Sequence, residues 1–313
     1  MSDSRLEWVA RDPASLRVVE LAQKVADAST TLLITGESGT GKDHLARLVH
    51  ELGPRRDAPF LKIDCASLPH DLVESELFGH ERGAFTGAVE RKLGRLELAA
   101  SGTIVLDEVA ALTSGIQAKL LRVLEERTFE RLGGTETLRI DARLIALTNT
   151  DLHAAVSAGR FREDLFFRLN VLTIQVPPLR ARPADVLPLA DHLLARLAAV
   201  HGRAGVSLSE DARRALQAYP WPGNVRELKN AIERALIFSK GSVLGLHDFP
   251  ESVRVALGGA AVHHARLRSL EEVEKEVIAA TLEATRYKIT KAAEILGISR
   301  KTLLDKRKRY GLN

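Results

Sequence analysis

The sequence is poor in cysteine and has no long apolar run. Cys65 is its single cysteine, so no disulfide can form within the chain, which fits a reducing cytosol. The opening segment, MSDSRLEWVARDP, lacks the apolar core of a signal peptide, and no later run is long enough to span a bilayer. We therefore expect a cytoplasmic protein without a membrane partner.

Composition is ordinary, but charge is unevenly placed. Apolar residues at 45% and charged residues at 27% of 313 residues predict a folded chain with a buried core. From Arg286 to the end, nine basic residues face only Glu294 and Asp305, so this tail carries +7 while the whole chain carries +4. A basic tail indicates an appended module that binds a polyanion, and a solvated charged helix explains the charge alone equally well.

Short apolar runs alternate with helical periodicity in the first half of the chain. The runs are continuous and rich in β-branched residues, as in strands buried on both faces of a parallel sheet. We therefore predict an α/β domain with a parallel sheet. The predicted strands are TTLLIT (30–35), PFLKIDC (59–65), GTIVLDE (102–108), RLIALTN (143–149) and VLTIQVP (171–177).

The later part of the chain is predicted to be helical. Residues 183–250 read as helices, and 251–268 contain a Gly-Gly-Ala-Ala stretch typical of a linker. The predicted domains are an α/β subdomain (1–178), an α-helical lid subdomain (179–250), a linker (251–268) and a C-terminal helical unit (269–313).

The segment GESGTGKD matches the phosphate-binding P-loop pattern up to Lys42, although a chance glycine-rich turn is the alternative. It lies between a predicted strand and a helix, where backbone N–H groups can curl around phosphates and Lys42 can neutralise them. Asp43 stands where the pattern has Ser or Thr, so a hydroxyl ligand for magnesium is missing. The predicted ATP-binding residues here are Gly36, Glu37, Ser38, Gly39, Thr40, Gly41, Lys42 and Asp43.

Asp107 and Glu108 follow a predicted buried strand, at the sheet edge where open α/β folds bind ligands. We expect Asp107 to hold Mg²⁺, directly or through water, and Glu108 to polarise the attacking water. An acidic pair at a strand end is alone often a helix cap, but after a P-loop it indicates an ATPase. Asn149 ends another strand at this edge and is a candidate sensor of the γ-phosphate.

Three arginines are further candidates. Arg162 and Arg168 lie on one predicted helix and could reach transition-state charge from a neighbouring subunit, or simply pair with Glu163 and Asp164. In WPGNVRELKN, Asn224 is predicted to be an N-cap with Glu227 completing a capping box. Arg226 then lies in the first helical turn, where the macrodipole disfavours a cation and a bound phosphate would favour it.

The stretch GHERGAFTGAVERKLG places one aromatic residue, Phe85, among small residues. It is too flexible for a helix and has too little side chain for a core strand. An exposed ring between Gly83 and Gly87 offers apolar contact area at a mobile site, while a ring tucked into the core as a loop anchor is the alternative.

Taken in order, GESGTGKD, ESELFGHERGAFTGA, GTIVLDE, GRFREDLFFRLNV and WPGNVRELKN resemble the central domain of bacterial enhancer-binding proteins. These are the NtrC-type AAA+ activators of sigma-54 RNA polymerase. The resemblance covers roughly residues 8–250, and the C-terminal unit resembles the family's Fis-like DNA-binding domain. It implies an AAA+ P-loop domain with a parallel sheet, an α-helical lid and an all-α helix-turn-helix domain, assembled into a hexameric ring.

The resemblance also implies roles for single residues. ATP and Mg²⁺ would be bound by the P-loop and Asp107, Glu108 would serve hydrolysis, Arg162 and Arg168 would act in trans, and Arg226 would be a second sensor. Asp64 stands where the family commonly has Asn, which holds the catalytic glutamate, so that switch is in doubt. The loop that contacts the sigma-54 RNA polymerase holoenzyme would be tipped by Gly83, Ala84, Phe85, Thr86, Gly87 and Ala88.

The C-terminal unit reads as a capped helix followed by helix, Gly297 turn and helix. Ser269 and Glu272 suggest a capping box, and Leu270, Val273, Val277 and Leu282 suggest a packing stripe. A second helix of this kind enters the DNA major groove, so upstream double-stranded DNA is an expected partner. The predicted DNA-binding residues are Ser299, Arg300, Lys301, Thr302, Lys306 and Arg307.

The main interpretation is a DNA-tethered ATPase that remodels sigma-54 holoenzyme. A non-hydrolysing, ligand-responsive repressor of the same fold and a branch-migration type of DNA motor are the alternatives. Because the first predicted strand begins about thirty residues from Met1, we expect no N-terminal sensor domain. We expect instead that a separate regulatory protein controls this chain in trans. A piece cut from a longer regulator is the alternative.

Overall fold

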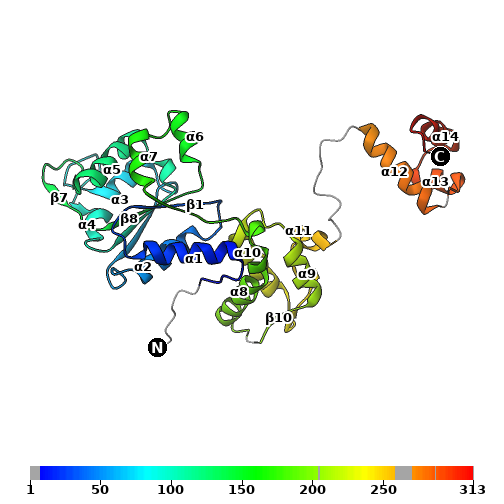
Figure 1. Ribbon diagram of the computed structural model, residues 1–313, viewed down its shortest axis with the longest axis horizontal. Coiled ribbons are helices and arrows are strands. Elements are labelled where there is room, and N and C mark those ends of the chain that lie inside the picture. The colour runs from blue at the N-terminus through cyan, green and yellow to red at the C-terminus, as the bar shows by residue number, and fades with distance from the viewer. Residues whose placement is uncertain (1–7, 204, 258–269, 286, 313) are drawn as a thin grey trace. The chain divides into compact units, whose positions relative to one another are not determined.

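The structure, a computed structural model, describes residues 8–203, 205–257, 270–285 and 287–312 (Figure 1). The chain divides into two compact units, Met1–Leu257 and Gly258–Asn313. Across the described residues, no helix is both long and apolar enough to cross a lipid bilayer.

The first unit is built on a five-stranded sheet in the order β2-β5-β8-β1-β9, and every neighbouring pair is parallel. All five strands lie within the predicted runs, so the α/β prediction is confirmed. The central strands are buried along their length, whereas β2 and β9 at the edges are partly exposed. The strands are β1 (Leu32–Thr35), β2 (Phe60–Asp64), β5 (Thr103–Asp107), β8 (Arg143–Thr148) and β9 (Leu172–Gln175).

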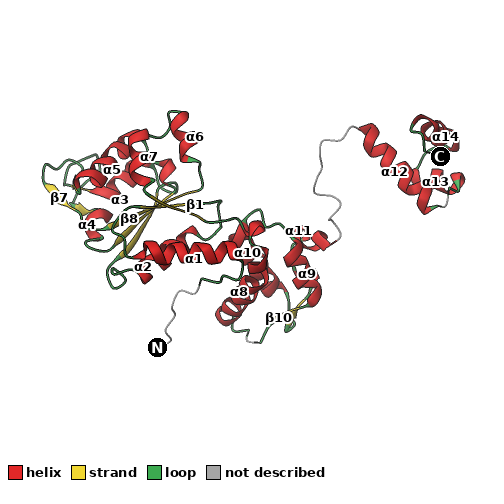
Figure 2. Ribbon diagram, in the orientation of Figure 1, coloured by secondary structure: helices red, strands yellow, loops and turns green. Residues whose placement is uncertain are grey.

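Helices cover both faces of the sheet, as Figure 2 shows. One face packs on α1 (Pro13–Ala26) and α2 (Lys42–Leu52), through Val18, Leu45 and Val49. The other face packs on α3 (His70–Phe78), α5 (Ser114–Glu126) and α7 (Glu163–Leu169). The smaller elements of this subdomain are β3 (Gly79–His80), β4 (Lys92–Leu93), α4 (Arg95–Leu98), β6 (Thr128–Glu130), β7 (Thr137–Arg139) and α6 (Leu152–Ser157).

The lid is helical around a core that includes the fully buried Trp221. Its helices are α8 (Val186–Val200), α9 (Glu210–Ala218), α10 (Asn224–Phe238) and α11 (Glu251–Arg254). Two short strands that the sequence did not predict, β10 (Ser207–Leu208) and β11 (Val243–Leu244), pair in parallel. Residues 251–257, predicted to be linker, are helical, and Val253 is buried in the lid core. Residues 258–268 of the predicted linker lie outside the described residues.

The second unit consists of α12 (Leu270–Ala284), α13 (Ile289–Leu296) and α14 (Arg300–Arg309). Gly297 has φ 67°, a left-handed conformation that ends α13 and turns the chain into α14. Ile278 and Leu282 of α12 are buried against Ala293 and Leu303. Within the predicted stripe, Leu282 is therefore buried, but Val277 is 49% exposed. Ser269 and the side chains of Leu270, Glu272 and Val273 lie outside what the structure describes.

Candidate active site between the sheet edge and the lid

The P-loop joins β1 to α2, as predicted, and α2 begins at Lys42. Gly39 has φ 78°, and a Cβ there would lie 2.5 Å from the Gly223 carbonyl oxygen of the lid. Only glycine therefore allows the loop and the lid to approach this closely. Thr40 closes the turn by donating its hydroxyl to the Glu37 carbonyl at 2.9 Å.

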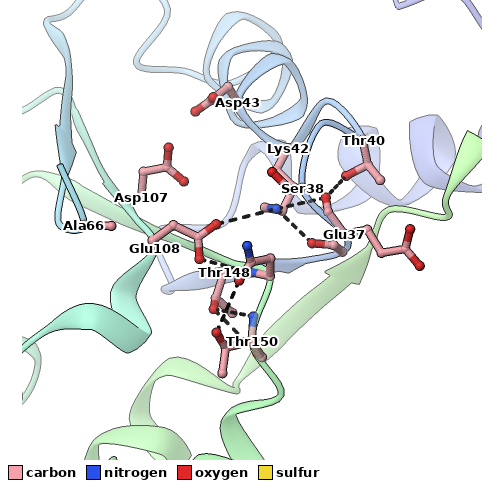
Figure 3. Close-up of polar contacts among 12 residues, drawn as sticks. Glu37, Ser38, Thr40, Lys42, Asp43, Ala66, Asp107, Glu108, Thr148 and Thr150 are labelled. Atoms are coloured by element: carbon pink, nitrogen blue, oxygen red, sulfur yellow. Dashed lines mark hydrogen bonds and ion pairs between the residues drawn. The ribbon is translucent and has the colours of Figure 1, made fainter. Parts of the chain in front are cut away.

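The Lys42 ammonium lies against the backbone of this loop (Figure 3). Its Nζ donates to the carbonyl oxygens of Gly36 at 2.8 Å and Glu37 at 3.1 Å, and lies 3.9 Å from Glu108 Oε1. Burial lowers the pKa of Lys42, and the nearby carboxylates oppose that shift. A largely desolvated cation held by neutral carbonyls can attract a phosphate strongly.

Asp107 ends β5 and Glu108 follows it beside Lys42, as the sequence predicted. Glu108 has φ 54° and ψ 53°, a left-handed conformation that is strained for a residue with a side chain. Its Oε2 accepts a hydrogen bond from the backbone N–H of Asn149, at 3.1 Å. Asn149 follows β8, the strand between β5 and β1, so the two predicted residues lie at one sheet edge.

Lys62 on β2 belongs to the site, although sequence reasoning missed it. Its Nζ lies 2.6 Å from Asp43 Oδ1 and 2.7 Å from Asp107 Oδ2. Burial alone would lower the pKa of Lys62, but hydrogen bonds to Asp107 and Asp43 outweigh it and raise this pKa. A lysine in a strand has no motif around it that could have identified the contact.

Asp64, which stands where the family commonly has Asn, caps a turn in this structure. Asp64 Oδ1 accepts from the backbone N–H groups of Ala66 at 3.0 Å and Ser67 at 3.1 Å. This carboxylate therefore stabilises the turn after β2. The group that donates a hydrogen bond to Glu108 is the backbone N–H of Asn149. Asp64 still lines the same cleft as Glu108.

The capping prediction for Asn224 is wrong in one respect. Gly223 is the N-cap of α10, and Glu227 Oε2 accepts from its N–H at 2.8 Å. Asn224 is the first helical residue, with φ 54°, and its side chain turns to the P-loop. It accepts from the Leu179 N–H at 2.7 Å and donates to the Ser38 carbonyl at 3.0 Å. The buried amide therefore joins the lid to the phosphate loop.

Other contacts strengthen this junction. The Gly39 carbonyl accepts from Val225 N–H at 3.0 Å and Arg226 N–H at 3.3 Å. Arg226 lies in the first turn of α10, as predicted, and its guanidinium donates to Ser38 Oγ at 2.7 Å. Arg226 and Lys229, one turn later, both line the cleft that contains Lys42.

Glu37 and Arg180 form a further link that the sequence did not indicate. Arg180 donates to Glu37 Oε2 at 2.8 Å, and Asn224 donates to the same oxygen at 3.3 Å. The hydrogen bonds from Arg180 and then Asn224 lower the pKa of Glu37 to about 2. The P-loop carboxylate is therefore held ionised by two groups from the lid side.

Two adjoining cavities lie along the P-loop. The larger, of about 590 Å³, is lined by Lys42, Asp107, Glu108 and Arg226. The smaller, of about 150 Å³, lies between Gly41 and α8 and is walled by Trp8 and Leu189. Trp8 and Arg182 both line this cavity. The Trp8 Nε1 and Arg182 Nε atoms are buried and have no hydrogen-bond partner in the described structure. Buried donors without partners are costly unless a ligand supplies an acceptor.

Arg162 and Arg168 do not line the phosphate cleft. Arg162 precedes α7 and pairs with Asp164 at 2.7 Å, one of the two partners considered from the sequence. Arg168 in the last turn of α7 pairs with Glu125 on α5 at 3.2 Å. Both side chains are about half exposed, at 44% and 56%, so they remain accessible at the surface.

The GAFTGA stretch, Gly83–Ala88, forms the tip of the loop between β3 and β4. The loop is closed by a hydrogen bond of 2.8 Å from Gly83 N–H to the Ala88 carbonyl. Phe85 is 44% exposed, so it is not a core anchor, and its ring meets the His80 ring edge-on at 4.9 Å. Thr86 is exposed, Ala88 is buried, and Ala84 packs on Gly133.

A buried arginine missed by sequence reasoning organises the base of this loop. Arg131 is 4% exposed and pairs with Glu81, Glu97 and Glu136 at 2.9, 2.8 and 3.0 Å. The hydrogen bonds that Arg131 donates to Glu97, and then to Glu81 and Glu136, raise the pKa of its guanidinium. The network joins the loop to α4 and to the β6–β7 hairpin.

In the second unit, Ser299 caps α14, as predicted, by accepting from Thr302 N–H at 3.1 Å. The Ser299 and Thr302 hydroxyls bond to each other, and Arg300 donates to Thr290. Lys306 pairs with Glu274 at 2.6 Å, and Arg307 donates to the Leu312 carbonyl. Among the six predicted DNA-binding residues, Lys301 has an exposed side chain without such a contact in the described part of the unit.

Comparison with known proteins agrees with this architecture. Family models match in three consecutive segments: the sigma-54 interaction domain at 8–175, the AAA+ ATPase lid domain at 180–265, and bacterial regulatory protein, Fis family, at 269–310. Relatives include transcriptional regulatory protein FlbD of Caulobacter vibrioides, 44% identical over 325 residues, which cover 99% of this chain and 71% of that protein. Regulatory protein AtoC of Escherichia coli is 43% identical over 97% of this chain and 68% of its own length.

Among solved structures, NtrX from Brucella abortus in complex with ATP has a TM-score of 0.76 and 34% identity, covering 98% of this chain and 70% of that one. The AAA+ fold with its lid and C-terminal helix-turn-helix is therefore confirmed. By its three matched segments, the chain belongs to the sigma-54-dependent transcriptional activators with a DNA-binding helix-turn-helix.

Proposed function

We propose that this chain hydrolyses ATP and uses the energy to remodel the sigma-54 RNA polymerase holoenzyme. The observation that carries the proposal is the cleft between sheet and lid, in which the Lys42 ammonium and the Glu108 carboxylate lie 3.9 Å apart. The P-loop amides and Lys42 would bind the β- and γ-phosphates. Arg226 would add a second cation from the lid, so nucleotide would bridge both subdomains.

The smaller cavity beside Gly41 suits the nucleotide base. Its walls are mostly apolar, and Trp8 offers a flat ring, as base-binding pockets commonly do. The unpartnered donors Trp8 Nε1 and Arg182 Nε could find acceptors on a bound base or ribose. Because this cavity shares Gly41 and Val225 with the phosphate cleft, one nucleotide can occupy both.

Mg²⁺ fits the residues at the β5 end. Asp43 and Asp107 already share one positive charge there, the ammonium of Lys62, and this pairing supports a cation at the same position. Asp107 would hold the metal, which when bound would neutralise charge on the phosphates. At position 43, where the P-loop pattern has the hydroxyl of Ser or Thr, this chain has the carboxylate of Asp43 near the proposed metal position.

Glu108 would polarise the attacking water. In this structure its Oε2 accepts a hydrogen bond from the Asn149 N–H at 3.1 Å, so this oxygen is already engaged. Loss of that bond as Asn149 responds to the γ-phosphate would free the carboxylate. Asp64 lines the same cleft and remains a proposed positioning residue.

The arginines of α7 support hydrolysis in an oligomer. Arg162 and Arg168 are surface-exposed and absent from the lining of their own subunit's cleft. We propose that they reach the cleft of a neighbouring subunit in a head-to-tail hexameric ring. Their ion pairs with Asp164 and Glu125 would hold the side chains until that neighbour docks.

The Gly83–Ala88 loop would make the contact with sigma-54, through Phe85 and Thr86. The Phe85 ring packs edge-on against the His80 ring, so a small change at the loop base could raise or retract it. The helix-turn-helix would tether the ring to upstream DNA. With the lid extended to 257, the proposed organisation is an ATPase subdomain, a lid and a DNA-binding domain.

ATP hydrolysis measured with and without sigma-54 tests the proposal. We expect turnover by the chain alone and a change in rate when sigma-54 is added. Nucleotide binding without turnover would favour a repressor of the same fold. Turnover that responds to branched DNA but not to sigma-54 would favour a DNA motor.

A further inference from the structure

The second helix of the helix-turn-helix, α14, uses one face to hold the second unit together. Leu303 is fully buried on this face, and Tyr310 packs into the same core. Lys306 lies 2.6 Å from Glu274 on α12, and Tyr310 donates to the other oxygen of that carboxylate at 2.6 Å. These side chains are committed to the fold and are poorly placed to read DNA.

The opposite face of α14 is exposed. It is formed by Lys301, Leu304, Asp305 and Lys308, whose spacing of three and four residues places them in one stripe. Leu304 is 48% exposed. In the parts of the chain that the structure describes, Asp305 has no ion pair, and Arg309, one turn later, pairs instead with Glu271 at 2.8 Å.

This stripe has an unusual chemistry for a helix that binds a polyanion. Asp305 is the single acidic residue of α14, and it lies beside an exposed leucine at the centre of an otherwise basic surface. Phosphates repel a carboxylate and offer nothing to a leucine. In the major groove, however, the cytosine N4 amino group donates to carboxylates, and the thymine methyl group favours apolar side chains.

We infer that Leu304 and Asp305 read base edges in the major groove, whereas Lys301 and Lys308 contact the flanking phosphates. Asp305 accepts from a cytosine amino group, and Leu304 contacts the methyl group of a neighbouring thymine. The inference rests on the proposed DNA binding by this unit. It adds which bases the unit recognises, a cytosine and a neighbouring thymine in each half-site. It assigns base recognition to residues other than Ser299, Thr302 and Lys306, because those three side chains form contacts within the unit.

Selection from randomised double-stranded DNA with the full chain tests the inference. Asp305→Asn preserves shape but favours the N6 and N7 atoms of adenine over cytosine. We expect the variant to lose one C·G preference in each half-site and gain A·T there, with a relative change of roughly 5- to 100-fold. Leu304→Ala should lose the thymine preference at the neighbouring position.

Lys308→Gln is the matched control on the same stripe. It should weaken all sequences alike and reduce the slope of log affinity against log salt by about one. All three side chains are exposed, so thermal unfolding of the variants should match the wild type.

The inference is overturned if Asp305→Asn selects the wild-type sequence and binds every DNA more tightly, because the carboxylate then only repels phosphates. An unchanged thymine preference in Leu304→Ala overturns the role of that residue. If the wild-type chain enriches no sequence, DNA binding by this unit is itself wrong, an outcome distinct from the other two.

Discussion

The ammonium nitrogen of Lys62 lies 2.7 Å from Asp107 Oδ2, so the proposed metal ligand is already paired with a cation of its own chain. A magnesium ion bound at this carboxylate oxygen would compete with Lys62. Lys62→Met should therefore lower the Mg²⁺ concentration needed for half-maximal nucleotide binding. A partly exposed pair of about 1 kcal/mol corresponds to roughly a fivefold change. Titration of Mg²⁺ against a fluorescent ATP analogue measures it.

Lys24→Met is the control for Lys62, because Lys24 is an exposed lysine on α1. It should leave the Mg²⁺ titration unchanged. An unchanged or higher Mg²⁺ requirement in Lys62→Met would mean that the lysine does not compete with the metal.

Lys42→Ala and Glu108→Gln should separate binding from hydrolysis. Lys42 lies over the phosphate loop, so its loss should weaken ATP binding by at least tenfold, at a cost of about 1.4 kcal/mol or more. Glu108→Gln should retain binding and reduce turnover by about 100-fold or more, because a general base is lost. Glu20→Gln, on the exposed side of α1, is the control. Normal turnover by Glu108→Gln would remove that residue from the mechanism.

Phe85→Ala should leave ATP hydrolysis by the isolated chain largely intact and abolish transcription activation. The ring is 44% exposed and packs on His80, away from the cleft that contains Lys42. Val89→Ala is a matched control, since Val89 is an exposed apolar residue just beyond the loop tip, at 74% exposure. If Phe85→Ala still binds sigma-54 with a transition-state nucleotide analogue, the contact role is contradicted.

Arg162→Ala and Arg168→Ala should each lose hydrolysis, and mixing either with Glu108→Gln should restore part of it. Mixed rings would then contain sites that combine an intact glutamate with an intact arginine from the next subunit. Absence of rescue in rings shown to be mixed would argue that the arginines act in cis or only hold the interface. ATP turnover at several mixing ratios distinguishes these cases.

The sequence was sufficient for features that are local. The five sheet strands are continuous apolar runs. The P-loop and the Asp107–Glu108 pair each lie in one short segment, and the residues next to them in the sequence were enough to identify them. Phe85 was predicted to be exposed because a ring between two glycines can offer apolar contact area at a mobile site.

The rest depends on contacts between distant segments. Arg180 meets Glu37 across 143 positions, and no pattern near either residue indicates the other. Lys62 and Arg131 look like ordinary surface charges until strands and loops bring carboxylates to them. Asn224 matched a local capping pattern, but its left-handed backbone turned the amide to the P-loop. Tertiary contacts overrode the local preference there.

The link between Glu37 and the lid should make stability depend on pH. Arg180 and Asn224 lower the pKa of Glu37 from 4.5 to about 2. A depressed folded-state pKa stabilises the protein above pH 4.5, and that contribution is lost as pH falls toward 2. The difference in unfolding free energy between wild type and Glu37→Gln should therefore be about 0.2–1 kcal/mol at pH 7, the range for an exposed ion pair, and shrink below pH 4.5. Urea titrations followed by tryptophan fluorescence report this unit, because Trp8 and Trp221 are the two tryptophans of the chain. A difference that stays constant from pH 7 to pH 3 would mean that the ionised form of Glu37 is not what the lid recognises.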